Sequence, residues 1–443
     1  MKSEKLALRK IYNQLIMNTY YCHSLGCKVN SYETSLITTE LDKEGYKKVD
    51  DASKANIIIL NTCSVTSTAD QKSRQHIRSL KNKAPNSILV VMGCYSQSHA
   101  ELASSMGADI VLGSSNRHLA LSYVKEFEKT HKKIVNVKSS VRKETYEEFG
   151  VGSFGLNARA YLKIQDGCDN FCSYCYIPQL RGNSRSRNPL DALNEANRLV
   201  ENGFKEIVLT GIHIGAYGKD LGDGSFRLAD LIESILAKNP TLKRLRISSI
   251  EESEIDEHLL HLIEKEERIV PHLHIPLQSG SSSVLKRMKR KYDTSSFLKK
   301  LDVIRSLRKD IAITTDVIVG FPLESDEEFQ ETMDFCTKAK FAEIHVFPFS
   351  SRPLTYAATL KDTEPAIKKE RTHELLALSK KMRLEYEKRF YGKPVEVLFE
   401  SYSAKEKKCY GHTPNYLLVG IESDTSLDGQ IKTIIYNPSV ASD

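Results

Sequence analysis

Three cysteines stand at C-x3-C-x2-C spacing in one short segment: Cys168, Cys172 and Cys175. Thiolates are soft ligands that suit iron–sulfur and zinc sites. Three of them on one loop can bind three irons of a 4Fe–4S cube and leave the fourth iron without a protein ligand. An open iron can chelate the amino and carboxylate groups of S-adenosylmethionine and reduce it by one electron, which breaks a carbon–sulfur bond. A structural zinc site is the alternative, but zinc usually closes with four ligands, and no fourth Cys or His follows nearby.

A second set of cysteines is scattered in sequence but shares one context. Cys27, Cys63 and Cys94 each come just after a β-rich run. Because the carboxyl ends of parallel strands line one crevice, these thiols can converge there, and we predict a second 4Fe–4S cluster. Neighbouring glycines allow close approach, and three amide side chains are expected to hydrogen-bond the cluster sulfurs: Asn30, Asn61 and Gln97. Cys22, Cys336 and Cys409 are interpreted as buried structural cysteines, the common role of a free thiol.

The elements that must position these cysteines follow an α/β pattern. From Tyr20 to about Val137, four β-rich runs (TYYCHSL, ANIIILN, SILVVMG and ADIVLG) alternate with helix-period segments. This alternation predicts a parallel sheet covered by helices. The polar, Gly-rich stretch Lys138–Gly155 is interpreted as a linker.

A second alternation begins at Ala158. Six runs are predicted to be strands: RAYLKIQ, EIVLTGI, RLRISSI, HLHIPLQ, AITTDVIVGF and EIHVFPF. Helical segments separate them, among them Leu190–Asn202, Leu228–Asn239 and Thr294–Arg308. Six units fit an incomplete (β/α)6 barrel better than a complete barrel of eight.

The last part of the chain changes character. After a charged helical run around Glu370–Arg389, the segments KPVEVLFES, NYLLVGIE and QIKTIIY predict a small all-β barrel. The domain boundaries that follow from these patterns are 18–140, 154–375 and 385–443.

The barrel strands should supply the rest of a cofactor pocket from their carboxyl ends. Thr210 and Gly211 offer exposed backbone for the methionine amino group, and the short polar side chains that follow the next strands suit a ribose. Gly320 lets an adenine approach the backbone closely. The predicted cofactor-binding residues are Tyr174, Thr210, Gly211, Ser248, Ser249, Gln278, Asp316 and Gly320.

Three basic segments suit an RNA partner, because cationic side chains bind phosphates without reading sequence. They are Arg181–Arg187, Lys286–Lys291 and Lys380–Lys393. For each, a solvated helix face is the alternative, and the last segment suits that alternative equally well. The predicted RNA-binding residues are Arg181, Arg185, Arg187, Lys286 and Lys289.

Composition is ordinary for a soluble globular protein. The 443 residues carry a formal net charge of +7, and the odd number of nine cysteines argues against a disulfide framework. The first twenty residues lack a secretory signal and are interpreted as a short extension. No apolar run approaches the roughly 20 residues that a membrane span needs. We therefore expect a cytoplasmic protein without a membrane partner.

These motifs resemble the methylthiotransferase family of radical S-adenosylmethionine enzymes, and the match covers nearly the whole chain past residue 18. SLGCKVNSYET, LNTCSVTSTAD and MGCYSQ resemble its amino-terminal cluster domain. KIQDGCDNFCSYCYIPQLRGNSRSR, IPLQSGSSSVLKRMKRKY and TTDVIVGFPLESDEEF resemble its radical barrel, and the tail is similar to an RNA-binding TRAM domain. Gly26–Asn30 is most similar to the MtaB-type branch. Leu354 and Tyr356 depart from the pattern, where the family usually shows Gly and Pro, and we expect them to alter a loop near the substrate mouth.

The resemblance implies methylthiolation at C2 of N6-threonylcarbamoyladenosine beside the anticodon of transfer RNA. It implies that Cys168, Cys172 and Cys175 bind the radical cluster, and that Cys27, Cys63 and Cys94 bind the auxiliary cluster. A 5′-deoxyadenosyl radical would remove hydrogen from C2, and a methylated sulfur at the auxiliary cluster would attack the carbon radical. A second S-adenosylmethionine supplies the methyl group, and an electron donor supplies the reducing equivalent. The sulfur source stays open, between the cluster itself and added sulfide.

Three other functions remain as alternatives. One is methylthiolation of isopentenyladenosine in transfer RNA, and another is modification of a ribosomal protein. The third, from a different class, is an RNA-binding scaffold with structural metal.

Overall fold

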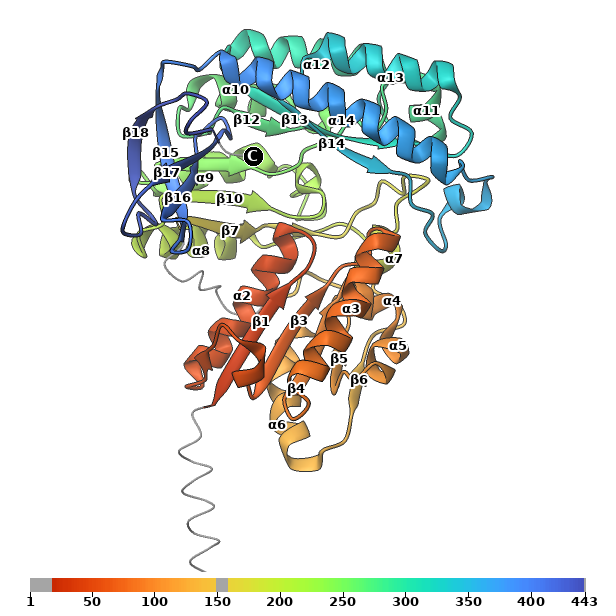
Figure 1. Ribbon diagram of the computed structural model, residues 1–443, viewed down its shortest axis with the longest axis vertical. Helices are drawn as coiled ribbons and strands as arrows, with labels where there is room; N and C mark the ends of the chain where they lie inside the picture. The colour runs from red at the N-terminus through yellow and green to blue at the C-terminus, as the bar shows by residue number, and fades with distance from the viewer. Residues whose placement is uncertain (1–17, 149–157, 442–443) are drawn as a thin grey trace, which may run out of the picture. The chain divides into compact units, whose positions relative to one another are not determined.

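The computed structural model describes residues 18–148 and 158–441. The expected amino-terminal extension, residues 1–17, and part of the expected linker, 149–155, lie outside the described residues. The chain forms two compact units (Figure 1). The amino-terminal unit contains the described residues up to Lys143, residues 147–148 and Gln179–Arg181, and the carboxy-terminal unit contains the remainder. Among the described helices, none combines the length and the apolarity that a membrane span requires.

The amino-terminal unit is a six-stranded sheet in the order β2-β1-β3-β4-β5-β6, and every neighbouring pair is parallel. Its strands are β1 (Thr19–Ser24), β2 (Lys47–Lys48), β3 (Ile57–Thr62), β4 (Ile88–Gly93), β5 (Ile110–Leu112) and β6 (Ile134–Asn136). Its helices are α2 (Lys28–Lys43), α3 (Ser67–Lys83), α4 (Cys94–Ser98), α5 (Ala100–Ser105) and α6 (Ala120–Thr130). The predicted parallel sheet is confirmed.

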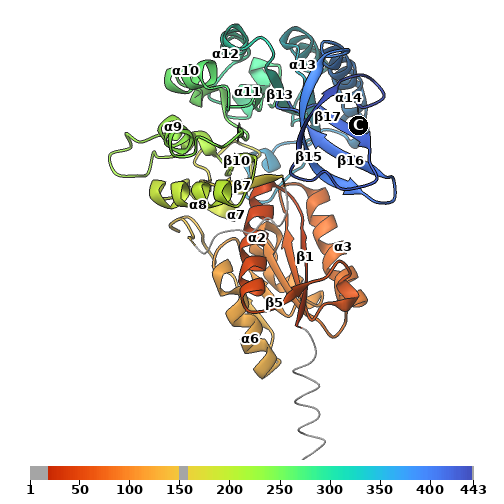
Figure 2. The ribbon, with the colours of Figure 1, turned by 90° about the vertical axis from the view of Figure 1, so that its left-hand side faces the viewer.

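Both faces of this sheet are covered, because its central strands are apolar on both sides. Ile58 and Leu60 of β3 pack with Ile77 of α3. Ile57 and Ile59, which point the other way, pack in a core that α2 and α6 complete. Figure 2 shows α2 and α6 on one side of the sheet and α3 on the other.

The carboxy-terminal unit contains all six predicted barrel strands, arranged in two parallel three-stranded sheets, β11-β10-β7 and β12-β13-β14. A parallel bridge between Leu245 and Ile269 links the two sheets. The strands are β7 (Arg159–Lys163), β10 (Glu206–Thr210), β11 (Arg244–Ile247), β12 (His272–His274), β13 (Ala312–Val319) and β14 (Glu343–Pro348). A short antiparallel pair accompanies them, β8 (Gln165–Asp166) with β9 (Arg185–Ser186).

Helices follow these strands as the hydrophobic periodicity predicts. They are α7 (Ile177–Arg181), α8 (Pro189–Glu201), α9 (Leu228–Lys238), α10 (Glu257–Lys265), α11 (Ser282–Arg287), α12 (Thr294–Leu307), α13 (Asp326–Ala339) and α14 (Pro365–Lys388). Single 3-10 turns lie at Ala52–Lys54, Arg117–Leu119, Ile214–Ala216, Glu252–Glu254 and Tyr356–Thr359. Alternate strand residues such as Leu209, Leu245 and Val317 pack against the helices in one large core. The intervening residues therefore face the other side of the two sheets, where a site can be built.

The tail forms a four-stranded antiparallel sheet in the order β17-β16-β15-β18. Its strands are β15 (Pro394–Ser403), β16 (Lys408–His412), β17 (Leu418–Glu422) and β18 (Ile431–Ile435). Val397, Phe399 and Val419 form its core together with Tyr386 of α14.

Five of the described strands were not predicted as strands of their own: β2, β6, β8, β9 and β16. The first two have only two and three residues at the sheet edges, and Lys47 and Lys48 of β2 are exposed charges without an apolar pattern. β16 has the sequence KCYGH, in which a lysine and a glycine weaken the β signal.

Candidate active site with two cysteine triads

The C-x3-C-x2-C loop comes between β8 and α7, beyond the carboxyl end of β7. A turn is closed by the hydrogen bond from Cys175 N to Cys172 O, at 3.0 Å. Residues after β12 hold the loop from outside: Ser173 N donates to Met288 O at 3.0 Å, and Ser173 Oγ donates to Arg287 O at 2.8 Å. Two segments far apart in sequence therefore fix the positions of the three thiols.

The sulfur atoms of this loop are surrounded by donors. Arg290 Nη1 lies 3.3 Å from Cys172 Sγ, and the same guanidinium forms an ion pair with Glu251. His213 Nδ1 lies 3.7 Å from Cys168 Sγ, and its Nε2 lies 2.8 Å from Glu254. Although burial opposes it, these two hydrogen bonds raise the pKa of His213 to about 10. Cationic donors beside the sulfurs suit thiolates rather than thiols.

Burial disfavours the charged thiolate form of these cysteines when no metal is bound. It raises the pKa of Cys175 to about 12 and also raises the pKa of Cys172. These sulfurs therefore remain protonated at neutral pH unless a metal displaces the protons. The donor set and its surroundings fit an iron–sulfur cluster.

The predicted pocket residues lie in or just after the barrel strands: Thr210 ends β10, Ser248 follows β11, and Asp316 lies within β13. Thr210 and Ser248 are buried on the face of β10 and β11 that lies opposite the helix-packed Leu209 and Ile247. Ser248 Oγ has no hydrogen-bond partner among the described residues. A buried hydroxyl in this state is a candidate for binding a ligand.

The backbone is strained at the fourth strand end. Gln278 has φ +68°, a left-handed conformation that costs a non-glycine residue about 1 kcal/mol. Two backbone hydrogen bonds to β13 hold Gln278 in this conformation. Gln278 N donates to Asp316 O at 2.8 Å, and Gln278 O accepts from Ile318 N at 2.9 Å. Strain of this kind is typical of functional sites.

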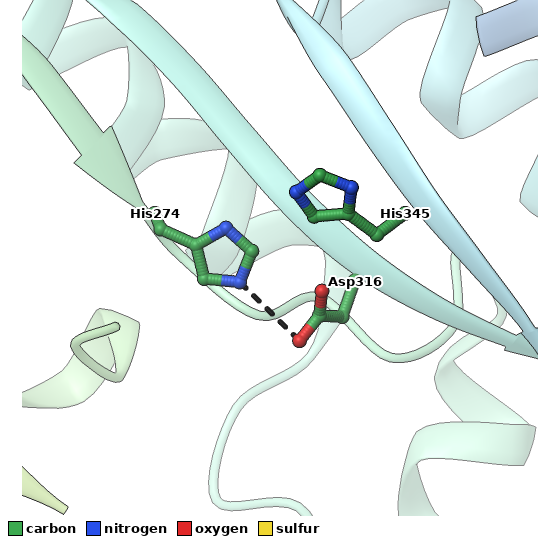
Figure 3. Close-up of side chains that lie close together, drawn as sticks. All are labelled: His274, Asp316 and His345. Carbon is green, nitrogen blue, oxygen red and sulfur yellow. Dashed lines mark ion pairs between the residues drawn. The ribbon is translucent and has the colours of Figure 1, made fainter. Parts of the chain in front are cut away.

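The remaining pocket residues differ in their surroundings. Tyr174 packs edge-on against Phe321, with ring centroids 6.4 Å apart. Gly211 is half-buried, and Ser249 is exposed. Gly320 has φ +66°, and its N donates to Glu324 Oε2 at 2.7 Å. The Asp316 side chain lies beside His274 and His345 (Figure 3), two histidines that the sequence analysis did not single out.

The second triad lies in the amino-terminal unit, at the carboxyl ends of three neighbouring strands. Cys27 precedes α2, Cys63 follows β3, and Cys94 is the first residue of α4. A Cβ on Gly26 would come 2.9 Å from Cys63 Cβ, so a glycine is needed for this approach. The Cys63 and Cys27 sulfurs are close enough for their charges to raise the pKa of Cys94, although burial is the main cause of its rise to about 12. These observations support the predicted convergence of the three thiols, which stays a prediction, and buried thiols at three strand ends fit a cluster on the same argument as the first triad.

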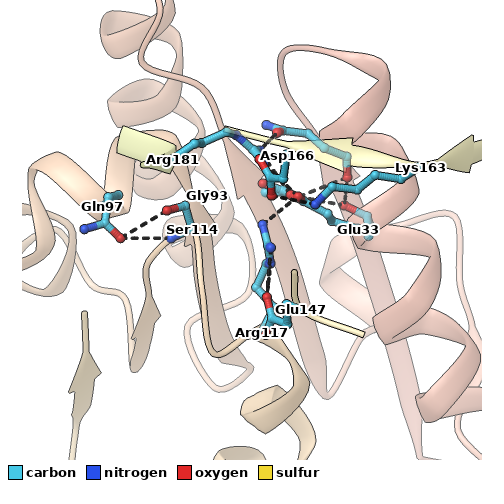
Figure 4. Close-up of polar contacts among 12 residues, drawn as sticks. Glu33, Gly93, Gln97, Ser114, Arg117, Glu147, Lys163, Asp166 and Arg181 are labelled. Atoms are coloured by element: carbon cyan, nitrogen blue, oxygen red, sulfur yellow. Dashed lines mark hydrogen bonds and ion pairs between the residues drawn. The ribbon is translucent and has the colours of Figure 1, made fainter. Parts of the chain in front are cut away.

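A buried network of charges joins Glu33 of α2, the helix that follows Cys27, to Arg117 and Arg181 (Figure 4). Arg181 donates to Asn30 Oδ1 at 2.7 Å and to Glu33 Oε1 at 2.8 Å. Arg117 lies 2.6 Å from the same Glu33 carboxylate and 2.8 Å from Glu147. Burial raises the pKa of Cys94, and the Arg181 guanidinium is close enough to oppose that rise. This network was not predicted from the sequence, in which the segment that contains Glu147 was interpreted only as a linker.

The three amides that were predicted to hydrogen-bond the cluster sulfurs donate to backbone carbonyls, and Asn30 Oδ1 also accepts a contact from Cys27 Sγ at 3.8 Å. Asn30 Nδ2 donates to Leu25 O and Thr62 O, and Asn61 Nδ2 donates to Asn30 O. Gln97 Nε2 donates to Lys138 O at 2.8 Å. These amides connect the loops that present the cysteines, because backbone carbonyls at strand ends also need donors.

The interpretation of Arg181, Arg185 and Arg187 as phosphate contacts is wrong. All three are buried and bound to carboxylates. Arg185 lies 3.1 Å from Asp166, Arg187 pairs with Glu195, and Arg181 pairs with Glu33. A buried, neutralised guanidinium cannot release counterions from RNA.

Lys286 and Lys289 are exposed, unlike the arginines beside them. Lys289 Nζ lies 5.3 Å from the ring centroid of Tyr356, which is itself 56% exposed. Leu354 has φ +63° and is 79% exposed. This leucine thus keeps a backbone conformation that favours glycine, the residue that the family usually has there.

Two family models match this chain. "Uncharacterized protein family UPF0004" matches residues 19–113, and "Radical SAM superfamily" matches residues 162–336. The first range contains Cys27, Cys63 and Cys94, and the second contains the C-x3-C-x2-C loop.

Similar proteins cover nearly the whole chain. A threonylcarbamoyladenosine tRNA methylthiotransferase MtaB of Bacillus subtilis (strain 168) is 42% identical over 94% of this chain and 93% of the relative. A tRNA-2-methylthio-N(6)-dimethylallyladenosine synthase of Bacillus cereus (strain B4264) is 34% identical over 93% of this chain and 82% of the relative. Among solved structures, the radical S-adenosylmethionine methyltransferase TsrM from Kitasatospora setae covers 77% of each chain with a TM-score of 0.57 and 13% identity, a likeness of fold alone. The chain therefore belongs to the radical S-adenosylmethionine methylthiotransferase family, in its MtaB-type tRNA methylthiotransferase branch.

Proposed function

We propose that this enzyme adds a methylthio group to C2 of N6-threonylcarbamoyladenosine next to the anticodon of transfer RNA. The observation that carries the proposal is the presence of two separate cysteine triads, one on a single loop beyond β7 and the other at the carboxyl ends of β1, β3 and β4. One triad suffices to generate a radical, whereas sulfur insertion needs a second centre. The identity of 42% to an MtaB relative supports the threonylcarbamoyl nucleoside as the substrate.

The cofactors are S-adenosylmethionine and two 4Fe–4S clusters. In this proposal Cys168, Cys172 and Cys175 hold the catalytic cluster, and Cys27, Cys63 and Cys94 hold the auxiliary cluster. Reductive cleavage of S-adenosylmethionine at the catalytic cluster supplies the radical that removes hydrogen from the adenine. Arg290 and His213 stabilise the thiolate charge of that loop through the contacts described above.

The chain's other pocket residues bind and orient S-adenosylmethionine. The Thr210 and Gly211 backbone receives the methionine amino group, and Gly320 admits the adenine. The Ser248 hydroxyl, whose buried oxygen has no hydrogen-bond partner in the part of the chain that the structure describes, donates to the ribose. We assign the same pocket to Tyr174, Ser249, Gln278 and Asp316. Tyr174 comes from the cysteine loop itself, so it can couple cofactor position to cluster position.

Transfer RNA binds through exposed cations and the tail. Lys286 and Lys289 flank the residues that hold the cysteine loop, so they are placed to contact phosphates next to the target nucleoside. We propose that 385–443 acts as a TRAM-like RNA-binding domain, that 154–375 is an incomplete (β/α)6 barrel, and that 18–140 is the auxiliary-cluster domain. The target adenine lies in an unpaired loop, where a base can be splayed into a pocket.

A reducing electron donor completes the reaction, and we place the enzyme in the cytoplasm with its transfer RNA, without a membrane partner. The sulfur atom derives from either the auxiliary cluster or an added sulfide. A reaction with sulfide labelled by a heavy isotope separates these two sources.

The test is an anaerobic reaction of the reconstituted enzyme with transfer RNA that carries threonylcarbamoyladenosine. We expect nucleoside mass spectrometry to detect its 2-methylthio derivative. Matched reactions use transfer RNA with dimethylallyladenosine and the ribosomal-protein peptide. A methylthio product only from the dimethylallyladenosine transfer RNA, or only from the ribosomal-protein peptide, would overturn the substrate assignment. About eight irons per chain, together with turnover of S-adenosylmethionine, would exclude the scaffold alternative.

A further inference from the structure

Two histidines and an aspartate lie side by side on one face of the sheet β12-β13-β14, apart from both cysteine triads in sequence. The register pairs Asp316 of β13 with His345 of β14, and it pairs His274 of β12 with Thr314, two residues before Asp316. Side chains two residues apart on a strand share a face. Figure 3 shows the three side chains pointing toward one another.

The three side chains are close enough to share one ion. One ligand atom from each residue lies within 4.8 Å of the other two. His274 Nε2 lies 3.3 Å from Asp316 Oδ2, and the His274 and His345 rings stack with centroids 5.6 Å apart. Two imidazoles and one carboxylate form the donor set of many sites for divalent transition metals.

Neighbouring groups orient these donors as they do around bound metals. Thr314 Oγ1 lies 2.9 Å from His274 Nδ1, which fixes the ring with Nε2 toward Asp316. Glu343 lies 3.7 Å from His345 Nδ1 and 3.3 Å from Arg383 Nη1, so it is held in place on the far side of that ring. Such outer contacts set the tautomer and the ring orientation of a ligating histidine.

A simple ion pair explains this arrangement less well. The 3.3 Å between His274 and Asp316 is longer than the roughly 2.7–2.9 Å of a charge-assisted hydrogen bond. An ion pair between His274 and Asp316 would also leave the His345 imidazole without a function. The cluster is also open to solvent, because the side-chain exposure rises from 13% at His274 to 28% at Asp316 and 46% at His345. An ion can therefore enter from the His345 side.

We propose that His274, Asp316 and His345 bind one divalent transition-metal cation, at a site beyond the proposed function that shares Asp316 with the proposed S-adenosylmethionine pocket and uses none of the six cluster cysteines. Three protein ligands leave coordination positions free, as in metal sites that bind an oxygen ligand or water. Imidazole nitrogens with one carboxylate suit Mn²⁺, Fe²⁺, Ni²⁺ and Zn²⁺ better than Mg²⁺ or Ca²⁺.

The test uses Mn²⁺ and the holoenzyme with both clusters oxidised, prepared anaerobically. Mn²⁺ is chosen because it prefers imidazole and oxygen ligands to thiolates, so it does not compete for the cysteines. The probe is the electron paramagnetic resonance signal of free Mn²⁺, which disappears on binding. We expect about one Mn²⁺ per chain.

Variants locate the binding. Asp316→Asn and His345→Ala should each weaken Mn²⁺ binding at least about tenfold. Thr314→Val, which removes the hydroxyl that contacts His274 and also His272, should weaken it roughly tenfold as well. His373→Ala, an exposed histidine of α14, is the matched control and should bind like the unmodified enzyme. Iron content per chain reports that each variant is folded.

Absence of Mn²⁺ binding by the holoenzyme would overturn the proposal in favour of an ion pair without metal. Unchanged affinity in Asp316→Asn and His345→Ala would also overturn it, because the ion would then lie elsewhere. If Asp316→Asn fails to retain iron, His345→Ala and Thr314→Val decide the result.

Discussion

Buried arginines, rather than surface cations, characterise the residues around both cysteine triads. Arg181 reaches Asn30 and Glu33 on α2, the helix that follows Cys27. Arg290 reaches Cys172 and Glu251. A guanidinium offers five donors in a fixed fork, so it can bind a carboxylate and still face a sulfur. We infer that these residues set the positions of the thiols.

Arg181→Ala tests this role at the residue scale. Because Glu33 would lose one of its two buried cations, we expect unfolding stability to fall by about 3–5 kcal/mol. We also expect weaker iron retention at the auxiliary triad and no change in the salt dependence of transfer RNA binding. Thermal denaturation, iron analysis and a salt titration measure these three quantities. A flatter salt dependence with unchanged stability would restore Arg181 as a phosphate contact.

Turns and strand ends position the triads at the scale of secondary-structure elements. Gly26 has φ +98°, and an added Cβ would come 3.1 Å from Cys63 Sγ. Gly45 has a similar φ of +83° but no neighbouring atom within 4 Å of such a Cβ. Alanine substitutions at Gly26 and at Gly45 therefore separate the effect of backbone strain, which both share, from the effect of steric contact, which only Gly26 has.

Gly26→Ala should therefore lose the auxiliary cluster, which is about four of eight irons. Gly45→Ala should keep the full iron content and lose only about 1 kcal/mol of stability from strain. Iron per chain after anaerobic reconstitution gives the answer. Equal iron content in the two variants would mean that the Gly26 approach does not shape the site.

The tail sheet and the barrel strands share a second buried network. Glu206 of β10 lies 2.7 Å from Arg246 and 2.9 Å from Arg159, while Arg159 and Arg244 reach Glu400 and Glu396 of β15. Burial raises the pKa of Glu206, but the arginines outweigh it and lower that pKa to about 2. Ionised Glu206 therefore stabilises the fold above its unfolded pKa of 4.5, and this contribution is lost as the pH falls from 4.5 toward 2.

Glu206→Gln should destabilise the protein at neutral pH by about 3–5 kcal/mol, because it leaves buried guanidinium groups without their counter-charge. The difference in melting temperature between the variant and the unmodified protein should shrink as the pH falls below 4.5. Glu396→Gln, whose side chain is 53% exposed, is the control and should cost under about 1 kcal/mol. A difference that is constant with pH would contradict the ionised state of Glu206.

The sequence allowed the strands and the cysteine positions to be predicted, because both depend on local patterns. Apolar runs such as Ile57–Leu60 mark a buried strand, and each triad cysteine follows such a strand or the loop beyond it. The partners of the charged residues were not predictable in this way. Arg181 and Glu33 are 148 residues apart, and Arg159 and Glu400 are 241 apart, so no short window contains both. The arginines of the segment Arg181–Arg187 were therefore interpreted as an exposed RNA-binding surface, although they are buried.

Association with transfer RNA is a property of the whole molecule, and two exposed lysines remain as its candidates. Lys286→Ala with Lys289→Ala should weaken transfer RNA binding and reduce the slope of log affinity against log salt by about 1.4, since each contact to a single strand contributes roughly 0.7. Lys299→Ala with Lys309→Ala removes the same charge from exposed positions in α12 and just beyond it and should leave that slope nearly unchanged. Equal slopes in the two double variants would remove Lys286 and Lys289 from the RNA interface.

The division of labour between the two triads is tested most directly by one pair of variants in the same anaerobic reaction. Cleavage of S-adenosylmethionine is measured as 5′-deoxyadenosine, and product is measured as the 2-methylthio nucleoside in digested transfer RNA. Cys172→Ala should abolish both, whereas Cys63→Ala should retain cleavage of S-adenosylmethionine and form no methylthio product. Methylthio product from Cys63→Ala at the level of the unmodified enzyme would contradict the assignment of a separate sulfur-inserting centre.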